Sequence, residues 1–132
     1  MIPFDEPLVH EGISYPAVEN FYQAMKTLDV ERRKEIAAAS PRKSKRMGQD
    51  SVLREDWSKV RHAVMRQALE HKFMLGTTHG NQLLETDGEI VEWNNWGDEY
   101  WGKDVRTNNG TNHLGKMLME IRSFLHMEAV FS

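Results

Sequence analysis

The 132-residue sequence has no cysteine, which excludes disulfide bridges, thiolate nucleophiles and cysteine-based zinc sites. It also has no run approaching the roughly 20 apolar residues that a membrane-spanning helix needs. Its first residues lack the basic and apolar segments of a secretory signal. We therefore expect a cytoplasmic protein with no membrane partner.

The motifs of several enzyme classes are missing as well. The sequence has no GxSxG, no P-loop and no GxGxxG. Its six histidines are scattered, and none of them forms an HExxH pair. We predict no metal site and no cofactor from these patterns.

The net charge is small, but the charged residues are distributed unevenly along the chain. The net charge is −3, so no global field favours nucleic acid. Residues 32–61 contain ten basic and four acidic side chains, whereas residues 85–104 contain seven acidic side chains and one lysine. This asymmetry fits an anionic ligand beside acid/base chemistry, although solvated helix faces are the simpler explanation from charge alone.

The length and the hydrophobic pattern predict one domain over residues 1–132, with a core that needs no disulfide. Apolar spacing and capping residues predict a mainly α fold, of α+β type with a few short strands. We expect short strand positions at Ile13 and Tyr15 and again over 90–93. The expected helices cover residues 16–28, 31–39, 40–48, 56–75 and 112–126.

The first predicted helix carries the polar residues of greatest interest. Glu19, Gln23 and Lys26 follow at i, i+4 and i+7, which places a carboxylate, an amide and an amine on one stripe beside the apolar face. Compensation of the helix dipole by Glu19 and surface pairing by Lys26 are the simpler explanations from position alone.

The segment from residue 94 to 111 is long for a loop in a compact domain, and such loops are often functional. It places Trp101 and other aromatic residues, together with Gly102, beside Asp98, a combination suited to stacking on a flat base with an acid or base nearby. Tryptophans that fill the core explain the same composition. Asn112 is expected to cap the last helix, whose start is a weak candidate anion site.

Four blocks in this order resemble the YbiA-like, or NADAR, family, and the resemblance covers nearly the whole chain. The opening block, Tyr15 to Lys26, is similar to the family pattern [F/Y]-P-[T/S]-[V/A]-E-H-[F/Y]-[F/Y]-Q-A-x-K. Ala17 and Asn20 depart from this pattern, which usually has Thr or Ser and His there. The other blocks contain Ser40-Pro41 with Lys45 and Gly48; Asp56-Trp57 with Val64-Met65 and Lys72-Phe73; and Asp98, Trp101-Gly102, Gly110, Asn112, Leu114-Gly115-Lys116 and Leu118 to Arg122.

The resemblance implies a compact, mainly helical YbiA-like fold and an N-glycosidase. Some family members hydrolyse phosphoribosylamino-pyrimidines of riboflavin biosynthesis, and others remove ADP-ribose from guanine bases in nucleic acid. The expected partner is therefore a small ribosylated nucleotide or ADP-ribosylated guanine in nucleic acid. The sequence leaves the choice of base and the oligomeric state open.

By this resemblance Glu19 and Asp98 are expected to act in acid/base catalysis and to stabilise positive charge at C1 of the ribose. Lys26 has two open roles, as a contact to phosphate or a ribose hydroxyl, or as the amine of a Schiff base. The remaining candidates are expected to bind substrate, with Arg122 read alternatively as a surface arginine: Trp57, Trp93, Trp101, Gly102, Asn112 and Arg122.

Two other classes of function compete with this hypothesis. A helical nucleic-acid-binding module would use the basic region and stack aromatic side chains on bases. A catalytically silent scaffold would keep the fold without turnover. The acidic stretch from residue 85 to 104 argues against the first, and the joint presence of Glu19, Lys26, Asp98 and Arg122 argues against the second.

Overall fold

The computed structural model describes residues 3–131 and confirms the mainly helical fold class with a few short strands. By its internal contacts the chain divides into two units, residues 1–72 and 73–132, which are described in turn. Within residues 3–131, no helix has both the length and the apolar character that crossing a bilayer requires.

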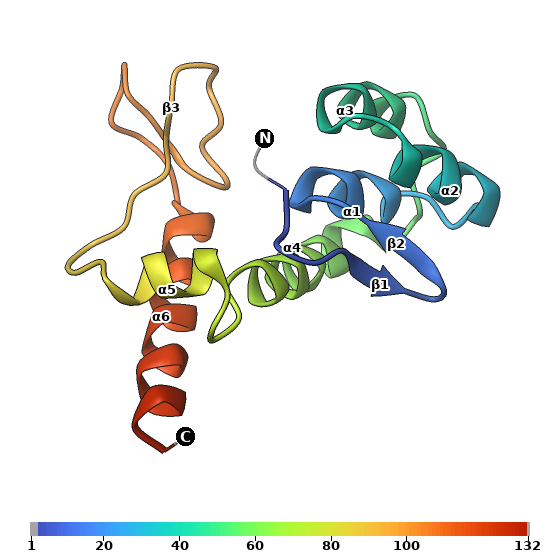
Figure 1. The fold of residues 1–132 in the computed structure, drawn as a ribbon. Helices are drawn as coiled ribbons and strands as arrows, with labels where there is room; N and C mark the ends of the chain where they lie inside the picture. The colour runs from blue at the N-terminus through green and yellow to red at the C-terminus, as the bar shows by residue number, and fades with distance from the viewer. Residues whose placement is uncertain (1–2, 132) are drawn as a thin grey trace. The chain divides into compact units, whose positions relative to one another are not determined.

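Unit 1 begins with an antiparallel hairpin and continues with four helices (Figure 1). The hairpin pairs Leu8 with Tyr15 and turns through Glu11 and Gly12, which both have positive φ as a tight hairpin requires. α1 contacts β2 and each of the other three helices, so it forms the centre of the unit. The elements are β1 (Leu8–His10), β2 (Ile13–Tyr15), α1 (Val18–Ala24), α2 (Val30–Ala38), α3 (Pro41–Gln49) and α4 (Trp57–Lys72).

The core of unit 1 gathers around the apolar face of α1. Phe21 is fully buried and meets the ring of Tyr15 edge-on, with ring centroids 5.3 Å apart. Asn20, on the same helix, is also fully buried and donates to the carbonyls of Ile36 and Ala39 at 3.0 and 2.9 Å. Those carbonyls lie at the end of α2, where a helix leaves its last acceptors unpaired. Asn20 therefore joins α1 to the C-terminus of α2.

The first predicted helix is shorter than expected at both ends. Pro16 is not its first residue, because Phe4 N donates to Pro16 O and Ala17 is extended before Val18. Ala17 offers no side-chain cap, as its departure from the family pattern predicts. The helix ends at Ala24, because the next two backbone carbonyls, those of Met25 and Lys26, accept hydrogen bonds from Arg54 instead of from a following turn of helix.

The starts of α2 and α3 are set by local caps, whereas the end of α3 differs from the prediction. Asp29 caps α2 with its carboxylate. Ser40 with Pro41 starts α3, in agreement with the predicted helix over residues 40–48. Gly48, however, does not stop α3. It lies inside that helix and is buried, because its missing side chain leaves room for Gln23 of α1.

Unit 2 consists of two helices and a long connecting segment with two short parallel strands. α5 packs against α6, and Trp93 and Asn94 pair with Lys103 and Asp104. α5 starts after Thr77, whose side-chain oxygen caps it by accepting a hydrogen bond from Gly80 N. The elements are α5 (Thr78–Leu84), β3 (Trp93–Asn94), β4 (Lys103–Asp104) and α6 (His113–Phe131).

The predicted strand over residues 90–93 is wrong except for its last residue. The Asn112 side chain takes the place of a neighbouring strand: Glu92 N donates to Asn112 Oδ1 at 3.0 Å, and Asn112 Nδ2 donates to Ile90 O at 2.9 Å. Asn112 is thus not the side-chain cap of α6 that was expected. Its amide holds the segment before β3 instead.

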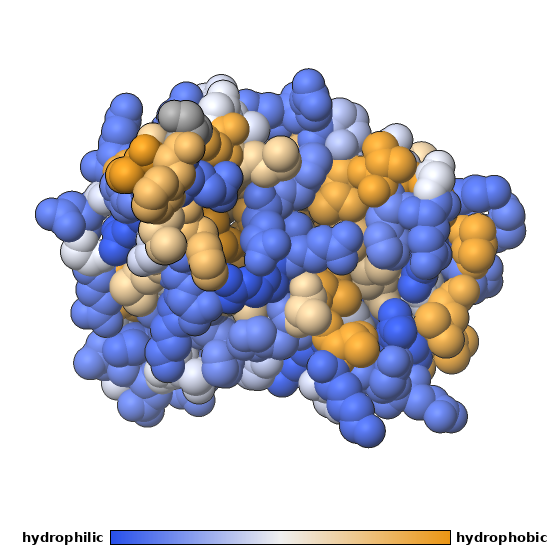
Figure 2. Space-filling model, turned by 90° about the horizontal axis from the view of Figure 1, so that it is seen from below, coloured by the Kyte–Doolittle hydropathy of each residue, from blue (hydrophilic) through white to orange (hydrophobic). Residues whose placement is uncertain are grey.

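The molecular surface in Figure 2 is mainly hydrophilic, with hydrophobic residues in separate groups. Scattered exposed apolar side chains are normal for a folded protein and do not by themselves indicate an interface.

Candidate functional site

Glu19 lies in the first turn of α1 and is half-buried. Its Oε1 accepts a hydrogen bond of 2.7 Å from Gln23 Nε2, one turn further along the helix. Its Oε2 accepts no hydrogen bond from residues 3–131. The carboxylate is therefore anchored through one oxygen while the other is available to a ligand.

Lys26 lies just beyond α1 with its amine partly buried. The Nζ atom is 5.5 Å from the centre of the Tyr22 ring. Burial lowers the pKa of Lys26, the Glu19 carboxylate acts in the opposite direction, and the Lys45 ammonium lowers the pKa further. The Glu19 carboxylate of α1 thus acts electrostatically on an amine that loses its proton more readily than an exposed lysine.

Trp57 starts α4 and is 8% exposed. Its ring meets Tyr22 edge-on, with ring centroids 5.1 Å apart. Because a base can stack only on an indole face that is open to solvent, this burial favours a core role for Trp57. Its predicted contact with substrate stays a prediction, and Tyr22, which lies between Trp57 and Lys26, is an aromatic residue that the sequence analysis did not select.

Arg54 holds the end of α1 and was also missed. Its backbone N donates to Lys26 O at 2.8 Å, and its Nη1 donates to Met25 O at 3.4 Å. The guanidinium also binds both oxygens of Asp56, at 2.6 and 3.1 Å, and this pairing lowers the pKa of the Asp56 carboxyl. The backbone of Lys26 is therefore fixed from the loop that precedes α4.

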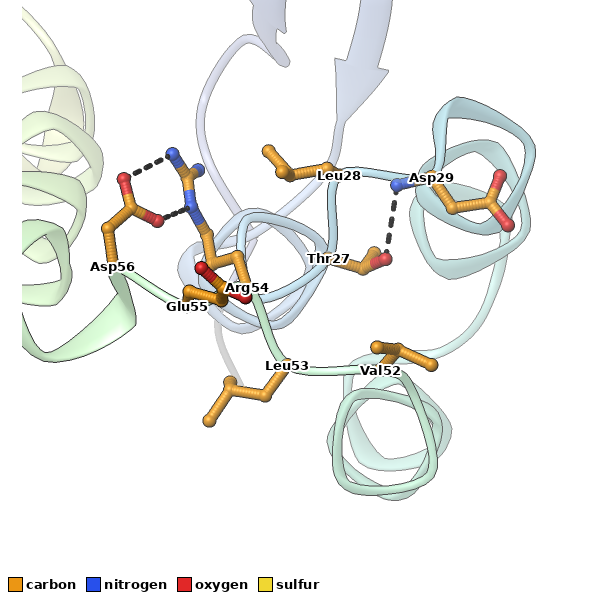
Figure 3. Close-up of a pocket in the computed structure, with 8 residues that line it drawn as sticks. All are labelled: Thr27, Leu28, Asp29, Val52, Leu53, Arg54, Glu55 and Asp56. Atoms are coloured by element: carbon orange, nitrogen blue, oxygen red, sulfur yellow. Dashed lines mark hydrogen bonds and ion pairs between the residues drawn. The ribbon is translucent and has the colours of Figure 1, made fainter.

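A groove of about 610 Å³ lies beside this contact (Figure 3). Its walls come from the segment after α1 and the segment between α3 and α4. None of the predicted site residues lines it, although it begins directly after Lys26. The lining residues are Thr27, Leu28, Asp29, Val52, Leu53, Arg54, Glu55 and Asp56.

Asp98 belongs to a tightly bonded loop in unit 2. Its Oδ1 accepts hydrogen bonds from Tyr100 N and Trp101 N, both at 3.0 Å. Asn94, which is 6% exposed, organises the same loop: its Oδ1 accepts from Asp98 N at 3.0 Å and its Nδ2 donates to Asp98 O at 2.7 Å. Sequence reasoning missed Asn94, because nothing in its local pattern shows that one amide would bond across the loop.

The two predicted stacking residues of unit 2 differ in exposure. Trp93 is 48% exposed, and Lys103 Nζ lies 6.0 Å from the centre of its ring. Trp101 is half-buried and meets Tyr100 edge-on, with centroids 4.7 Å apart. Trp93 therefore has the more accessible ring for a flat ligand.

Gly102 and Asn112 both contribute to the packing of the backbone in unit 2. Gly102 is buried, and a Cβ there would overlap Glu92 O and lie 3.2 Å from Asn94 Nδ2. Asn112 is 3% exposed and has a φ of 56°, a conformation that asparagine tolerates better than most residues. Both residues let backbone segments approach closely, and their predicted contacts with substrate stay predictions.

Arg122 binds protein groups in the structure. Its Nη1 donates to Thr86 Oγ1 at 3.1 Å and its Nη2 donates to Gly88 O at 2.6 Å. The guanidinium thereby attaches α6 to the turn after α5. A contact with phosphate or ribose is a prediction that would use the remaining N–H groups.

The predicted residues fall into two groups, one in each unit. In unit 1 the Glu19 carboxylate acts electrostatically on the Lys26 amine, and Trp57 lies beside Tyr22. Within residues 3–131, no group of three or more His, Asp or Glu side chains is arranged to hold a metal ion. The remaining predicted residues lie in unit 2: Trp93, Asp98, Trp101, Gly102, Asn112 and Arg122.

The comparison with protein families supplies the identity. The model of the NADAR domain family matches residues 3–126. This chain belongs to the NADAR domain family. The NADAR match runs through residues of both units, and the single domain over residues 1–132 stays a prediction.

Individual NADAR relatives agree with this assignment. The chain is 38% identical over 125 residues to N-glycosidase YbiA of Escherichia coli (strain K12), covering 92% of this chain and 78% of that protein. It is 34% identical over 127 residues to N-glycosidase Npun_R5314 of Nostoc punctiforme, covering 89% and 81%. It is also 32% identical over 126 residues to riboflavin biosynthesis protein VVA0006 of Vibrio vulnificus, covering 92% of this chain and 34% of that one.

The NADAR fold is also seen in a solved structure. The NMR structure of E. coli YbiA is similar with a TM-score of 0.78 and 37% sequence identity, covering 94% of this chain and 75% of that chain. The predicted YbiA-like fold is therefore confirmed.

Proposed function

We propose that this protein is an N-glycosidase that hydrolyses the C–N bond between a phosphorylated ribose and a nitrogenous base or amine. One observation carries the proposal: α1 holds a singly anchored carboxylate, Glu19, near the partly buried amine of Lys26. The names of the relatives, two of them N-glycosidases, support the same class of reaction.

Glu19 suits the charge that develops during this reaction. Cleavage of an N-glycosidic bond builds positive charge on C1 of the ribose, and a fixed carboxylate stabilises that charge. Departure of the base also needs a proton on nitrogen or on the ring. Glu19 and Asp98 are the proposed acid/base and charge-stabilising groups, with their individual roles to be separated by Glu19→Gln and Asp98→Asn.

Lys26 suits the role of nucleophile because its pKa is lowered, which increases the fraction of neutral amine. In the ring-opened substrate, C1 is joined to the base nitrogen as an imine. Lys26 Nζ adds to C1, the base leaves as an amine with the transferred proton, and a lysine imine remains. Water then adds to C1, releasing the sugar aldehyde and the free lysine.

Borohydride trapping tests this step. Reduction during turnover is expected to fix the sugar on Lys26, as a mass increase on the peptide that contains it, and Lys26→Arg removes the adduct. If turnover continues at the normal rate in borohydride with no adduct, Lys26 is not the nucleophile and its phosphate- or hydroxyl-binding role replaces this one.

The substrate class is tested by direct comparison. The relative named as a riboflavin biosynthesis protein favours phosphoribosylaminouracil, whereas guanine-ADP-ribosylated oligonucleotide represents the alternative. Mass spectrometry is expected to show release of ribose 5-phosphate from the first, and no release by Glu19→Gln. Release of ADP-ribose alone would reassign the substrate, and turnover of neither by folded protein would contradict the proposed function.

A further inference from the structure

We infer that Gln23 is a positioning residue that holds the Glu19 carboxylate in its reactive orientation, backed by Gly48 of α3. This inference rests on the proposed role of Glu19 in catalysis. Gln23 itself has no contact with the reacting atoms in this scheme and acts through Glu19.

Gln23 is a buried polar residue of α1 and is 4% exposed. Its Nε2 donates to Glu19 Oε1 at 2.7 Å, a short bond of the kind that a charged acceptor forms. A neutral amide fixes the direction of the carboxylate without cancelling its negative charge. A lysine or arginine in the same place would neutralise the charge that stabilises the transition state.

Gly48 limits where the Gln23 amide can lie. A Cβ at Gly48 would overlap Gln23 Oε1 and would lie 2.9 Å from Gln23 Cβ and 3.0 Å from Gln23 Cδ. The α3 backbone therefore packs directly on this side chain. Such packing removes alternative rotamers, and this is how supporting residues keep a reactive group within a narrow range of positions.

The orientation of the amide follows from the charge of its neighbour. Gln23 Oε1 is buried and has no hydrogen-bond partner among residues 3–131. An unpaired buried acceptor of this kind opposes folding, because it is removed from water and gains no partner in exchange. Turning the amide by 180° would point its oxygen at the Glu19 carboxylate and lose the bond as well. The observed orientation therefore leaves Gln23 Oε1 without a partner and directs Gln23 Nε2 at Glu19.

The test replaces the amide with an apolar side chain of similar length, Gln23→Met, and measures kcat and KM on the substrate that the wild type cleaves. We expect kcat to fall by about 10- to 100-fold, with KM changed less than twofold, because misplacement of a reacting group affects the chemical step. Gln67→Met is the matched control, since Gln67 is exposed on α4 of the same unit. It is expected to keep full activity.

A double-mutant comparison separates positioning from general support of the fold. If Gln23 acts through Glu19, then Gln23→Met has no further effect on the residual kcat of Glu19→Gln. A loss by the same factor in both backgrounds, or full kcat in Gln23→Met alone, would overturn the inference. Full kcat in Glu19→Gln would instead contradict the proposed function.

A second measurement does not depend on activity. The side-chain NH₂ resonances of Gln23, followed by NMR during acid titration of the folded protein, are expected to move with protonation of Glu19 and to stay fixed in Glu19→Gln. Resonances that do not differ between the two proteins would overturn the inference even if no substrate is found. Gly48→Ala, which displaces Gln23, is expected to reproduce the kcat loss if Gln23→Met fails to fold.

Discussion

At the scale of single residues, partial burial of the Lys26 amine opposes folding at neutral pH. Burial lowers its pKa from the usual 10.5, so the folded state binds this proton less tightly than the unfolded chain does. The stability contributed by this group is therefore lowest at pH values below its folded pKa. It rises as the pH increases toward 10.5. A group kept under this penalty fits a catalytic amine.

Lys26→Met is accordingly expected to raise the melting temperature at pH 7 while abolishing turnover. The gain should shrink as the pH is raised toward 10, because the folded wild type then loses the Lys26 proton and no longer bears the cost of burying that charge. Differential scanning calorimetry between pH 6 and 10 measures this difference in melting temperature between the variant and the wild type. Lys34→Met is the control, since Lys34 is exposed and pairs with Glu31 at the surface. A lower melting temperature for Lys26→Met at pH 7 would contradict the burial argument.

Tyr15 offers a second prediction at this scale. Its ring is fully buried, its hydroxyl has no hydrogen-bond partner among the described residues, and burial raises its pKa. Tyr15→Phe keeps the ring contact with Phe21 and removes an unsatisfied polar group, so unfolding in urea should show a gain of about 1 kcal/mol. A loss of stability of that size would instead show that the hydroxyl is bonded in solution.

Among individual residues, the sequence predicted that Glu19 and Gln23 share a face of α1, because helical spacing fixes which side chains lie together. Lys26 lies beyond the end of α1, which the helical pattern did not show. It did not predict that Gln23 is buried, since that depends on Gly48 of another helix. Trp57 is buried, which the sequence did not predict, because hydrophobic spacing does not distinguish a core aromatic residue from one that lines a site. Its contact with substrate stays a prediction.

At the scale of elements, the local signals that worked were those whose physical cause is local. Asp29 and Ser40 cap α2 and α3 because their side chains bond to backbone N–H groups two or three residues away. The boundaries that failed depend on distant partners. α1 ends early where Arg54 binds its carbonyls, and the strand over 90–93 is replaced by bonds to Asn112.

The loop around Asp98 gives a testable prediction for an element. Asn94 makes hydrogen bonds to the backbone at Trp96, Asp98 and Lys103. Asn94→Ala is expected to increase amide hydrogen exchange over residues 95–104 by more than tenfold and to leave exchange in α4 unchanged. Mass spectrometry of peptides from both segments measures the effect. Unchanged exchange in the loop would show that its shape does not depend on Asn94.

At the scale of the whole molecule, composition and periodicity were sufficient for the fold class, because six amphipathic or capped helices dominate the sequence. The YbiA-like fold came from four ordered motifs rather than from any physical rule, and the NADAR match over residues 3–126 confirms it. The substrate did not follow from the same motifs, since one fold can serve several chemistries.

The single domain predicted over residues 1–132 is open to a thermodynamic test. We expect one unfolding transition by calorimetry, with equal calorimetric and van't Hoff enthalpies, because a single domain of this length usually unfolds cooperatively. Two separate transitions would contradict the prediction and would assign independent stability to the units at residues 1–72 and 73–132.

The connecting segment of unit 2 is held by backbone contacts at Gly102 and Gly110 and by the amides of Asn94 and Asn112, while Trp96 is 71% exposed. Its outward side chains therefore contribute little to its path. Evolution or a randomised library can therefore substitute the exposed residues of this segment while its backbone conformation is kept. Within one family, new ligand preferences can then arise on this segment without a new fold, and the glycines and the two asparagines are the positions that such variation must spare.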